Sequence, residues 1–332
     1  MPRRTPLLAA LALVGGLVAG GSAADGATTT PEFRVPDHAT LKIVGHGYGH
    51  GRGMSQYGAE GAARQGLGAK QIVKFYYPNT RAGTFQGKVR VLISEDTDQN
   101  TTVVNQAGLK VRDLGNGSTF AVPTSGKIAK ATRWRMSSKS GDPAKVSYLT
   151  DSWHVWRTLT GDGEFSAAKP IKLVLPSGPT PYRGVLQSRT STRGGSAPHR
   201  ITVNQVSMED YVRAVVPSEA FPSWHQAALR AQAIAARSYA AYKMGQPLSD
   251  LYELCDTAAC QVYGGVAAEY PTTNEATAKT AGQIRTYLGA PALTEFSSSN
   301  GGWTVKSSLP YQVAQQDPYD GWSGNPNHTW ST

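Results

Sequence analysis

The sequence has few acidic residues and few cysteines, and it has a single long apolar run. Of its 332 residues, 23 are Asp or Glu and 33 are Lys or Arg, which gives a formal net charge of +10 at pH 7. A basic surface suits an anionic polymer such as nucleic acid, an acidic membrane face or an acidic cell envelope. The basic residues form no long block interleaved with aromatics, so we favour an envelope polymer and expect no nucleic acid.

The apolar run lies near the N-terminus and has the layout of a secretory signal peptide. Two arginines precede the apolar residues 7–19, and the small residues 22–24 provide a cleavage site. The run is too short to span a membrane comfortably. We predict a bacterial signal peptide over 1–24 and a polar linker over 25–40, with an uncleaved N-terminal anchor as the alternative. No other run of 18 apolar residues occurs, so we expect no transmembrane span in the mature, exported chain.

The two cysteines, Cys255 and Cys260, are five residues apart. Neighbouring cysteines of an exported protein most often form a disulfide, which is the pairing that we predict. The loop that this bond closes is small, so its stabilising effect would be modest. The alternative is a zinc site, which would need two further ligands, and no His lies inside or immediately beside this segment.

Residues 81–190 predict a β-rich module. Short runs that alternate apolar and polar residues occur there, separated by turn signals such as those at 115–117 and 176–179. The runs cover 88–93, 109–114, 130–136, 145–150, 153–159, 171–175 and 182–187. Short strands at this spacing are typical of a β-rich module.

A long helix is predicted over 224–243. This segment has eight Ala and no Gly or Pro, and its 20 residues would span about 30 Å as a helix. Ser223 and Gln226 fit a capping box at its start, while Gly245 and Pro247 fit its end. The many alanines imply close packing and a buried position.

These elements predict an α+β protein. Its core would contain the long buried helix and would be divided in sequence between a Gly- and His-containing segment at 41–80 and the stretch 191–332. The β-rich module at 81–190 would be inserted between the two parts.

Glu219 lies four residues before Ser223, in a Val-Val-Pro-Ser-Glu segment. The ordinary explanation of such a residue is a solvated carboxylate in a loop. The alternative is a general acid at the mouth of a groove. The residues next to Glu219 do not distinguish these two roles, whereas motifs elsewhere in the chain do.

Arg230 and Arg237 are seven residues apart on the predicted helix, so they share one face. Two arginines on an otherwise Ala-rich helix need partners, because buried charges must be paired. They could form ion pairs with Glu209, Asp210 or Asp256. Otherwise they could bind substrate or hold Glu219 in place.

Four segments together resemble the SpoIID/LytB family, which comprises stage II sporulation protein D and the amidase-enhancer proteins. The segments are 208–240 with its Pro-Ser-Glu motif, the cysteine segment 255–265, the Ser- and Gly-rich segment 297–304, and the Gly-His segment 47–59. The resemblance covers about 40–80 and 180–320. The β-rich middle matches only in general character.

The resemblance implies a lytic transglycosylase that acts on the glycan strands of peptidoglycan, with Glu219 as its catalytic residue. One Glu can serve twice in this reaction, first protonating the glycosidic oxygen and then accepting the proton of the sugar's C6 hydroxyl as a 1,6-anhydro ring closes. No metal or second acid is required, so we expect no metal and no other cofactor. A cell-wall amidase is a candidate partner, and the protein is expected to be secreted or cell-wall associated.

The resemblance also implies substrate-binding positions. The basic positions of the family's long helix fall on Arg230 and Arg237. The serine of the Ser- and Gly-rich segment corresponds to Ser298 or Ser299, and the inserted Asn300 leaves this register open. The His that often precedes the second Cys and can bind zinc is an Ala here, which favours the disulfide.

The Gly-His segment contains Gly at 45, 47, 49, 51, 53 and 58. It could be a flexible linker, or His46 and His50 could form a metal pair, although two His at this spacing converge only on a helix. We favour a tight backbone turn that lines a sugar groove, where His50, Gln56 and Tyr57 would offer hydrogen bonds.

The position of the Gly-His segment differs from that in much of the family, where it follows the Ser- and Gly-rich segment. Here it precedes every other motif, as in a circular permutation. This order predicts that residues 45–77 pack against the region near 297–322 and that the two ends of the domain lie close together.

A catalytic role for Glu219 makes a demand on its pKa. A general acid needs a raised pKa to carry its proton near neutral pH. Arg230, Arg237 or a helix N-terminus nearby would lower the pKa of Glu219, and burial against Phe221 and Trp224 would raise it.

Two other functions stay open. The protein could be a non-catalytic amidase enhancer that binds glycan, or it could be a structural protein of the cell wall.

Overall fold

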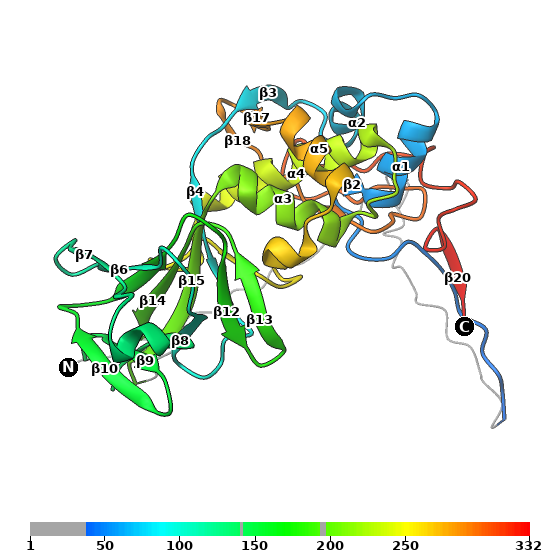
Figure 1. The fold of residues 1–332 in the computed structure, drawn as a ribbon. Helices are drawn as coiled ribbons and strands as arrows, with labels where there is room; N and C mark the ends of the chain where they lie inside the picture. Colours follow the sequence, from blue (N-terminus) through cyan, green and yellow to red (C-terminus); the bar gives the residue numbers. More distant parts are fainter. Residues whose placement is uncertain (1–37, 140–141, 193–196) are drawn as a thin grey trace, which may run out of the picture. The chain divides into compact units, whose positions relative to one another are not determined.

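The computed structural model describes residues 38–139, 142–192 and 197–332. The predicted signal peptide and most of the predicted linker lie outside the described residues. Every described helix and strand belongs to the unit Ile43–Thr332. None of the described helices is long and apolar enough to cross a membrane. The mixture of helices and sheets confirms the predicted α+β class (Figure 1).

In the described part of the chain, thirteen strands form two of the sheets. They are β4 (Lys88–Leu92), β5 (Thr101–Val104), β6 (Lys110–Asp113), β7 (Thr119–Ala121), β8 (Arg133–Ser137), β9 (Lys145–Leu149), β10 (Trp153–Thr158), β11 (Gly163–Ser166), β12 (Ile171–Leu175), β13 (Gly178–Tyr182), β14 (Val185–Ser191), β15 (His199–Ser207) and β16 (Leu254–Cys255). One sheet has the order β10-β9-β8-β5-β12-β13 and the other β16-β4-β15-β14-β11-β6-β7. Trp134, Phe165 and Leu173 are fully buried in their shared core. Each of the seven runs expected from the sequence overlaps a strand.

The second sheet continues past residue 190, where the sequence suggested that the module ends. β15 pairs with β14 on one side and with β4 on the other, so it is an interior strand of this sheet. Its last residue, Ser207, is also the N-cap of the next helix, where its side chain accepts a hydrogen bond from the Asp210 N–H. The β sheet therefore leads into the helices without a linker.

The helices gather around the predicted long helix (Figure 1). They are α1 (Gln56–Arg64), α2 (Ala69–Tyr76), α3 (Met208–Glu219), α4 (Gln226–Met244) and α5 (Pro271–Lys279), with short 3₁₀ turns η1 (Lys127–Lys130) and η3 (Gly265–Ala268). α4 packs against the four other α-helices. Its alanines let neighbouring helices approach on several sides, which confirms that the long helix is buried.

The predicted capping box of α4 is wrong. Its N-cap is His225, and no side chain of the cap bonds the first turn. Glu60 of α1 accepts hydrogen bonds from the His225 backbone N–H (2.8 Å) and from His225 Nδ1 (2.7 Å). A carboxylate from another helix therefore takes the place of a local cap, and it also complements the positive end of the helix dipole.

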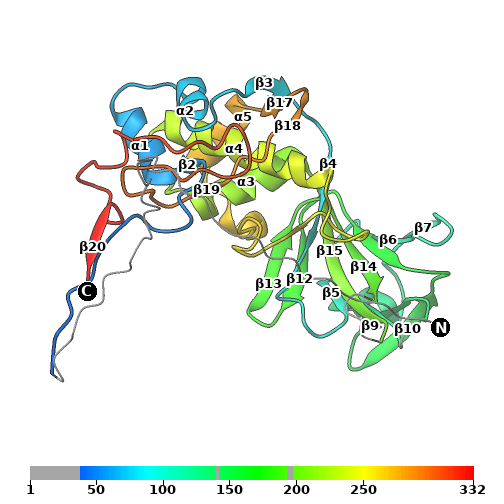
Figure 2. The same cartoon turned by 180° about the vertical axis from the view of Figure 1, so that it is seen from behind.

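The segments before α1 and after α5 pair with each other. They contain β1 (Val44–His46), β2 (Met54–Ser55), β3 (Arg81–Thr84), β17 (Gln283–Tyr287), β18 (Ala290–Pro291), β19 (Phe296–Ser297) and β20 (Thr329–Ser331). β2 pairs with β19, β3 with β17, and β1 with β20; β2 and β19 are labelled side by side in Figure 2. The predicted packing of residues 45–77 on the region near 297–322 is confirmed, and the two ends of the domain lie together.

Candidate functional site

Glu219 is the last residue of α3, not a loop residue as its sequence context suggested. Pro217 lies within the last turn, and Ala220 has extended backbone, so the helix stops here. A helix C-terminus carries partial negative charge and does not favour an ionised carboxylate. This is the opposite of the helix N-terminus that would have favoured it.

Two donors bind the Glu219 carboxyl. Oε1 accepts a hydrogen bond from the Val262 N–H (3.1 Å) and Oε2 accepts one from Gln56 Nε2 (3.2 Å). Burial raises the pKa of Glu219, and these two hydrogen bonds oppose the rise without cancelling it. The effect of burial is the larger one, so the pKa of Glu219 is raised overall, as a general acid requires.

Glu219 lines a cavity of about 280 Å³. The other lining residues are His50, Arg52, Tyr239, Ala258, Ala259, Cys260, Val262, Glu295 and Phe296. They come from the Gly-His segment, the long helix, the cysteine segment and the residues just before the Ser- and Gly-rich segment. Three of the four recognised segments therefore line this cavity, and the fourth begins directly after the lining residue Phe296.

Three of the lining residues, Arg52, Tyr239 and Glu295, were not among the site residues predicted from the sequence. Arg52 Nη2 lies 2.7 Å from Glu295 Oε1, and Arg52 Nε donates to Glu295 Oε2 at 3.2 Å. Burial would raise the pKa of Glu295, but the hydrogen bond and charge of Arg52 outweigh it and hold this pKa below its usual value. A signal for this pair existed, because Arg52 is the one charged residue of the Gly-His segment 47–59, and Glu295 is an isolated charge just before the Ser- and Gly-rich segment that was expected to meet it.

The Gly-His segment forms the tight turn that we favoured over a flexible linker. Gly47, Gly49, Gly51 and Gly53 all have positive φ angles. A Cβ at Gly53 would lie 2.1 Å from the carbonyl oxygen of Glu295, so only Gly fits there. The turn thus brings its side chains close to the backbone of the Ser- and Gly-rich segment.

His50 lies at the edge of the cavity. Its Nδ1 accepts a hydrogen bond from the Arg52 N–H (3.0 Å). Burial and the charge of Arg52 lower the pKa of His50, so its ring is neutral at neutral pH and carries its proton on Nε2. His46 contacts Thr329 instead, so the two His do not form a pair.

The two arginines of the long helix lie outside the cavity. Arg237 is fully buried, and Glu209 accepts its Nε (2.9 Å) and Nη2 (2.8 Å) hydrogen bonds. Arg230 lies 3.9 Å from Glu275 of α5. The arginines share a face as predicted, but that face points to α5 and the start of α3. The sequence left two explanations open, ion pairing and substrate binding. In the structure both arginines form ion pairs, Arg237 with the predicted partner Glu209 and Arg230 with Glu275.

Ser298, Ser299 and Tyr57 also lie outside the cavity. The buried Ser299 donates to Asp320 Oδ2 (2.8 Å), and Ser298 accepts from Asn327 Nδ2 (2.9 Å). The Tyr57 N–H donates to the Ser298 carbonyl (3.0 Å), and its ring packs on Trp224. These hydrogen bonds connect the Ser- and Gly-rich segment to the C-terminal residues and to the Gly-His segment.

Cys255 and Cys260 form the predicted disulfide, with an S–S distance of 2.06 Å. A disulfide leaves no thiolate to bind zinc, so the structure favours the first of the two alternatives. The bond closes the loop that precedes Val262, and Cys260 itself lines the cavity. The disulfide therefore supports the segment that donates a hydrogen bond to Glu219.

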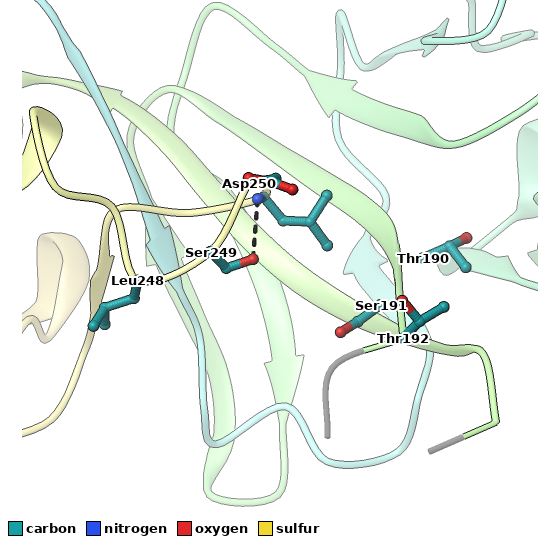
Figure 3. Close-up of a pocket in the computed structure, with 7 residues that line it drawn as sticks. Thr190, Ser191, Thr192, Leu248, Ser249 and Asp250 are labelled. Atoms are coloured by element: carbon teal, nitrogen blue, oxygen red, sulfur yellow. Dashed lines mark hydrogen bonds between the residues drawn. The ribbon is translucent and has the colours of Figure 1, made fainter. Parts of the chain in front are cut away.

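Another depression, of about 380 Å³, lies between the end of β14 and the loop 248–251 (Figure 3). Thr190, Ser191, Thr192, Leu248, Ser249, Asp250 and Leu251 line it. It has one carboxylate and none of the recognised motifs. We assign no function to it.

The fold and the cavity define an α+β protein with a partly buried acid where several motifs meet, and part of this chain matches a known family. Residues 197–287 match the family model SpoIID, described as stage II sporulation protein. These residues include Glu219 and the disulfide, whereas the Gly-His segment and Glu295 lie outside the match. The resemblance to the SpoIID/LytB family is therefore confirmed for this part of the chain.

Three relatives agree with this match. The chain is 39% identical over 121 residues to the amidase enhancer of Bacillus subtilis (strain 168), covering 34% of this chain and 16% of that protein. It is 37% identical over 115 residues to an uncharacterized protein of Brachyspira hyodysenteriae, covering 34% of this chain and 31% of the relative. It is 48% identical over 42 residues to stage II sporulation protein D of Bacillus subtilis, covering 13% and 12%. Each match thus spans less than a third of the relative's length.

Proposed function

We propose that this protein is an exported lytic transglycosylase that cleaves peptidoglycan glycan strands and leaves 1,6-anhydro ends. The observation that carries the proposal is that Glu219 is a partly buried carboxyl with a raised pKa in a polar cavity. The SpoIID match, and the sporulation protein and amidase enhancer among the relatives, support a function in the cell wall. The secretory layout of the N-terminus supports export.

The proposed reaction uses Glu219 twice. The protonated carboxyl gives its proton to the glycosidic oxygen, and the C1–O bond breaks with its electron pair going to that oxygen. The C6 hydroxyl of the same sugar then bonds to C1, and its proton returns to Glu219. The nucleophile belongs to the substrate, so no water or covalent enzyme intermediate is needed. Gln56 and Val262 stabilise the carboxylate that exists between the two proton transfers.

The relative named amidase enhancer supports a second candidate function. In that function the protein would bind glycan without cleaving it and would stimulate a cell-wall amidase. Exposed aromatic side chains suit sugar rings: Phe221, two residues after Glu219, is 56% exposed. Product analysis separates the two functions.

The test is incubation of the mature protein with isolated peptidoglycan, followed by mass spectrometry of the soluble fragments. We expect 1,6-anhydromuramic ends that accumulate with time. Reducing ends alone, or no fragments at all, would contradict the transglycosylase. Stimulation of an added amidase without any new glycan ends would establish the second function instead.

Gln56→Leu is expected to move the alkaline limb of the pH–rate profile to higher pH. The amide of Gln56 stabilises the ionised form of Glu219, so removing it raises a pKa that burial already raises. The catalytic acid then keeps its proton to higher pH. One hydrogen bond of about 1 kcal/mol corresponds to a shift of about 0.7 pH units.

The measurement is the initial rate of anhydro-end formation between pH 4 and 9. Gln106→Leu is the matched control, because Gln106 donates to the Lys169 carbonyl in the β-rich module and lies away from the cavity. A limb that stays in place, or that moves to lower pH, would show that Gln56 does not tune the acid.

A further inference from the structure

A second carboxylate lies in the cavity that contains Glu219. Glu295 lines this cavity together with Arg52. The same two residues also line a neighbouring cavity of about 410 Å³, with Tyr242 and residues 305–309. Because the two cavities share Arg52 and Glu295, a polymer that occupies both must pass over this ion pair.

Both oxygens of Glu295 are held by Arg52, and its side chain keeps 19% of its surface exposed. The pKa of Glu295 is lowered by Arg52 against the effect of burial, whereas the pKa of Glu219 is raised by burial. Tyr239 lies near both groups, since burial and the negative charges of Glu295 and Glu219 together raise its pKa. The cavity thus holds one carboxyl whose pKa is raised and one whose pKa is lowered.

Two carboxyls whose environments push their pKa values apart can divide the tasks of acid and charge stabiliser in glycosidic bond cleavage. We propose that Glu295, ion-paired with Arg52, contacts the sugar ring beside Glu219 and stabilises the positive charge that develops at its anomeric carbon. This inference rests on the proposed function. No bond forms to Glu295, because the C6 hydroxyl supplies the new bond to C1 and Glu219 handles both protons.

The test compares two ligands by calorimetry and needs no turnover. One ligand is a peptidoglycan tetrasaccharide, and the other is its analogue with a ring ammonium in the reacting sugar. Glu295→Gln is expected to weaken binding of the cationic analogue by roughly tenfold to a hundredfold, while binding of the tetrasaccharide changes by less than about threefold. A protein that binds both ligands but makes no anhydro ends would contradict the proposed function, while a loss of preference for the cationic analogue in Glu295→Gln would still show that Glu295 recognises positive charge at this ring.

Glu253→Gln is the matched control. Glu253 accepts hydrogen bonds from Nε and Nη2 of Arg90, the same two guanidinium nitrogens with which Arg52 holds Glu295. It directly precedes β16 and lines neither cavity. It is expected to leave the affinity of both ligands unchanged. Equal weakening of both ligands by Glu295→Gln, an unchanged affinity for the analogue, or no binding of either ligand by the wild type would overturn the inference.

Arg52→Gln gives a second readout that a purely structural ion pair would not affect. Without Arg52, burial dominates and the pKa of Glu295 rises, so Glu295 becomes neutral at a higher pH than in the wild type. The preference for the cationic analogue should then be lost at a higher pH as the pH falls from 7 to 4. An identical pH dependence in Arg52→Gln and in the wild type would count against the proposal, even if Glu295→Gln fails to fold.

Discussion

Glu219→Gln is expected to abolish glycan cleavage and to keep glycan binding. General acid catalysis contributes about 10²- to 10⁴-fold, and here the same residue would serve as acid and base, so we expect a loss of about 10³-fold or more. The amide has the size of the carboxyl but cannot supply or take up the proton. Because burial already favours the neutral form of Glu219, a neutral amide should leave the fold intact.

The measurement pairs the rate of anhydro-end formation with co-sedimentation of the variant on insoluble peptidoglycan. Glu275→Gln, which changes a half-exposed carboxylate of α5 beside Arg230, is the control and should keep wild-type cleavage. Cleavage by Glu219→Gln above about a tenth of the wild-type rate would remove Glu219 from the mechanism. Loss of binding would mean that the carboxyl holds substrate instead.

Glu209→Gln is expected to lower the free energy of unfolding by about 3 kcal/mol, the lower end of the usual cost of removing one partner of a buried ion pair, because the Glu209 side chain is 33% exposed. Arg237 has no exposed side-chain surface, so its charge would lose its one carboxylate partner without gaining water. Its remaining contacts are backbone carbonyls, such as those of Gln283 and Ala233. Urea denaturation of the purified variants measures the change.

The ion pair between α4 and α5 provides the contrast. Glu275→Gln breaks a pair that is 3.9 Å long and whose carboxylate is 56% exposed, so it should cost less than about 0.5 kcal/mol. The double variant Glu209→Gln with Arg237→Met should be no less stable than Glu209→Gln, because it removes the stranded charge. Equal costs for Glu209→Gln and Glu275→Gln would mean that the Arg237 pair is not a structural anchor of α4.

The sequence was sufficient for features that depend on local patterns. Alternating residues predicted strands, and an Ala-rich stretch without Gly or Pro predicted α4, because side chains repeat along strands and helices with fixed periods. The motif order predicted that the Gly-His segment meets the Ser- and Gly-rich segment, and β2 does pair with β19. The requirement that Glu219 be protonated also came from chemistry alone, before its surroundings were known.

Local sequence patterns did not predict which distant residues contact each other in the fold. The spacing of Arg230 and Arg237 fixed their common face but not what that face meets, which is α5 and Glu209. The cap of α4 comes from Glu60, 165 positions away from His225 in sequence. No periodic signal encodes a contact over such a distance.

The site itself shows the same division. The motif identified Glu219 as a candidate, but only the tertiary structure placed it at the end of α3 and supplied its donors, with Gln56 lying 163 positions away in sequence. Arg52 and Glu295, 243 positions apart, were two isolated charges in the sequence and became an ion pair in the cavity. Residue types set which chemistry is available, whereas burial and long-range pairing set the protonation states, because the pKa of a group depends on the solvent and charges that folding brings around it.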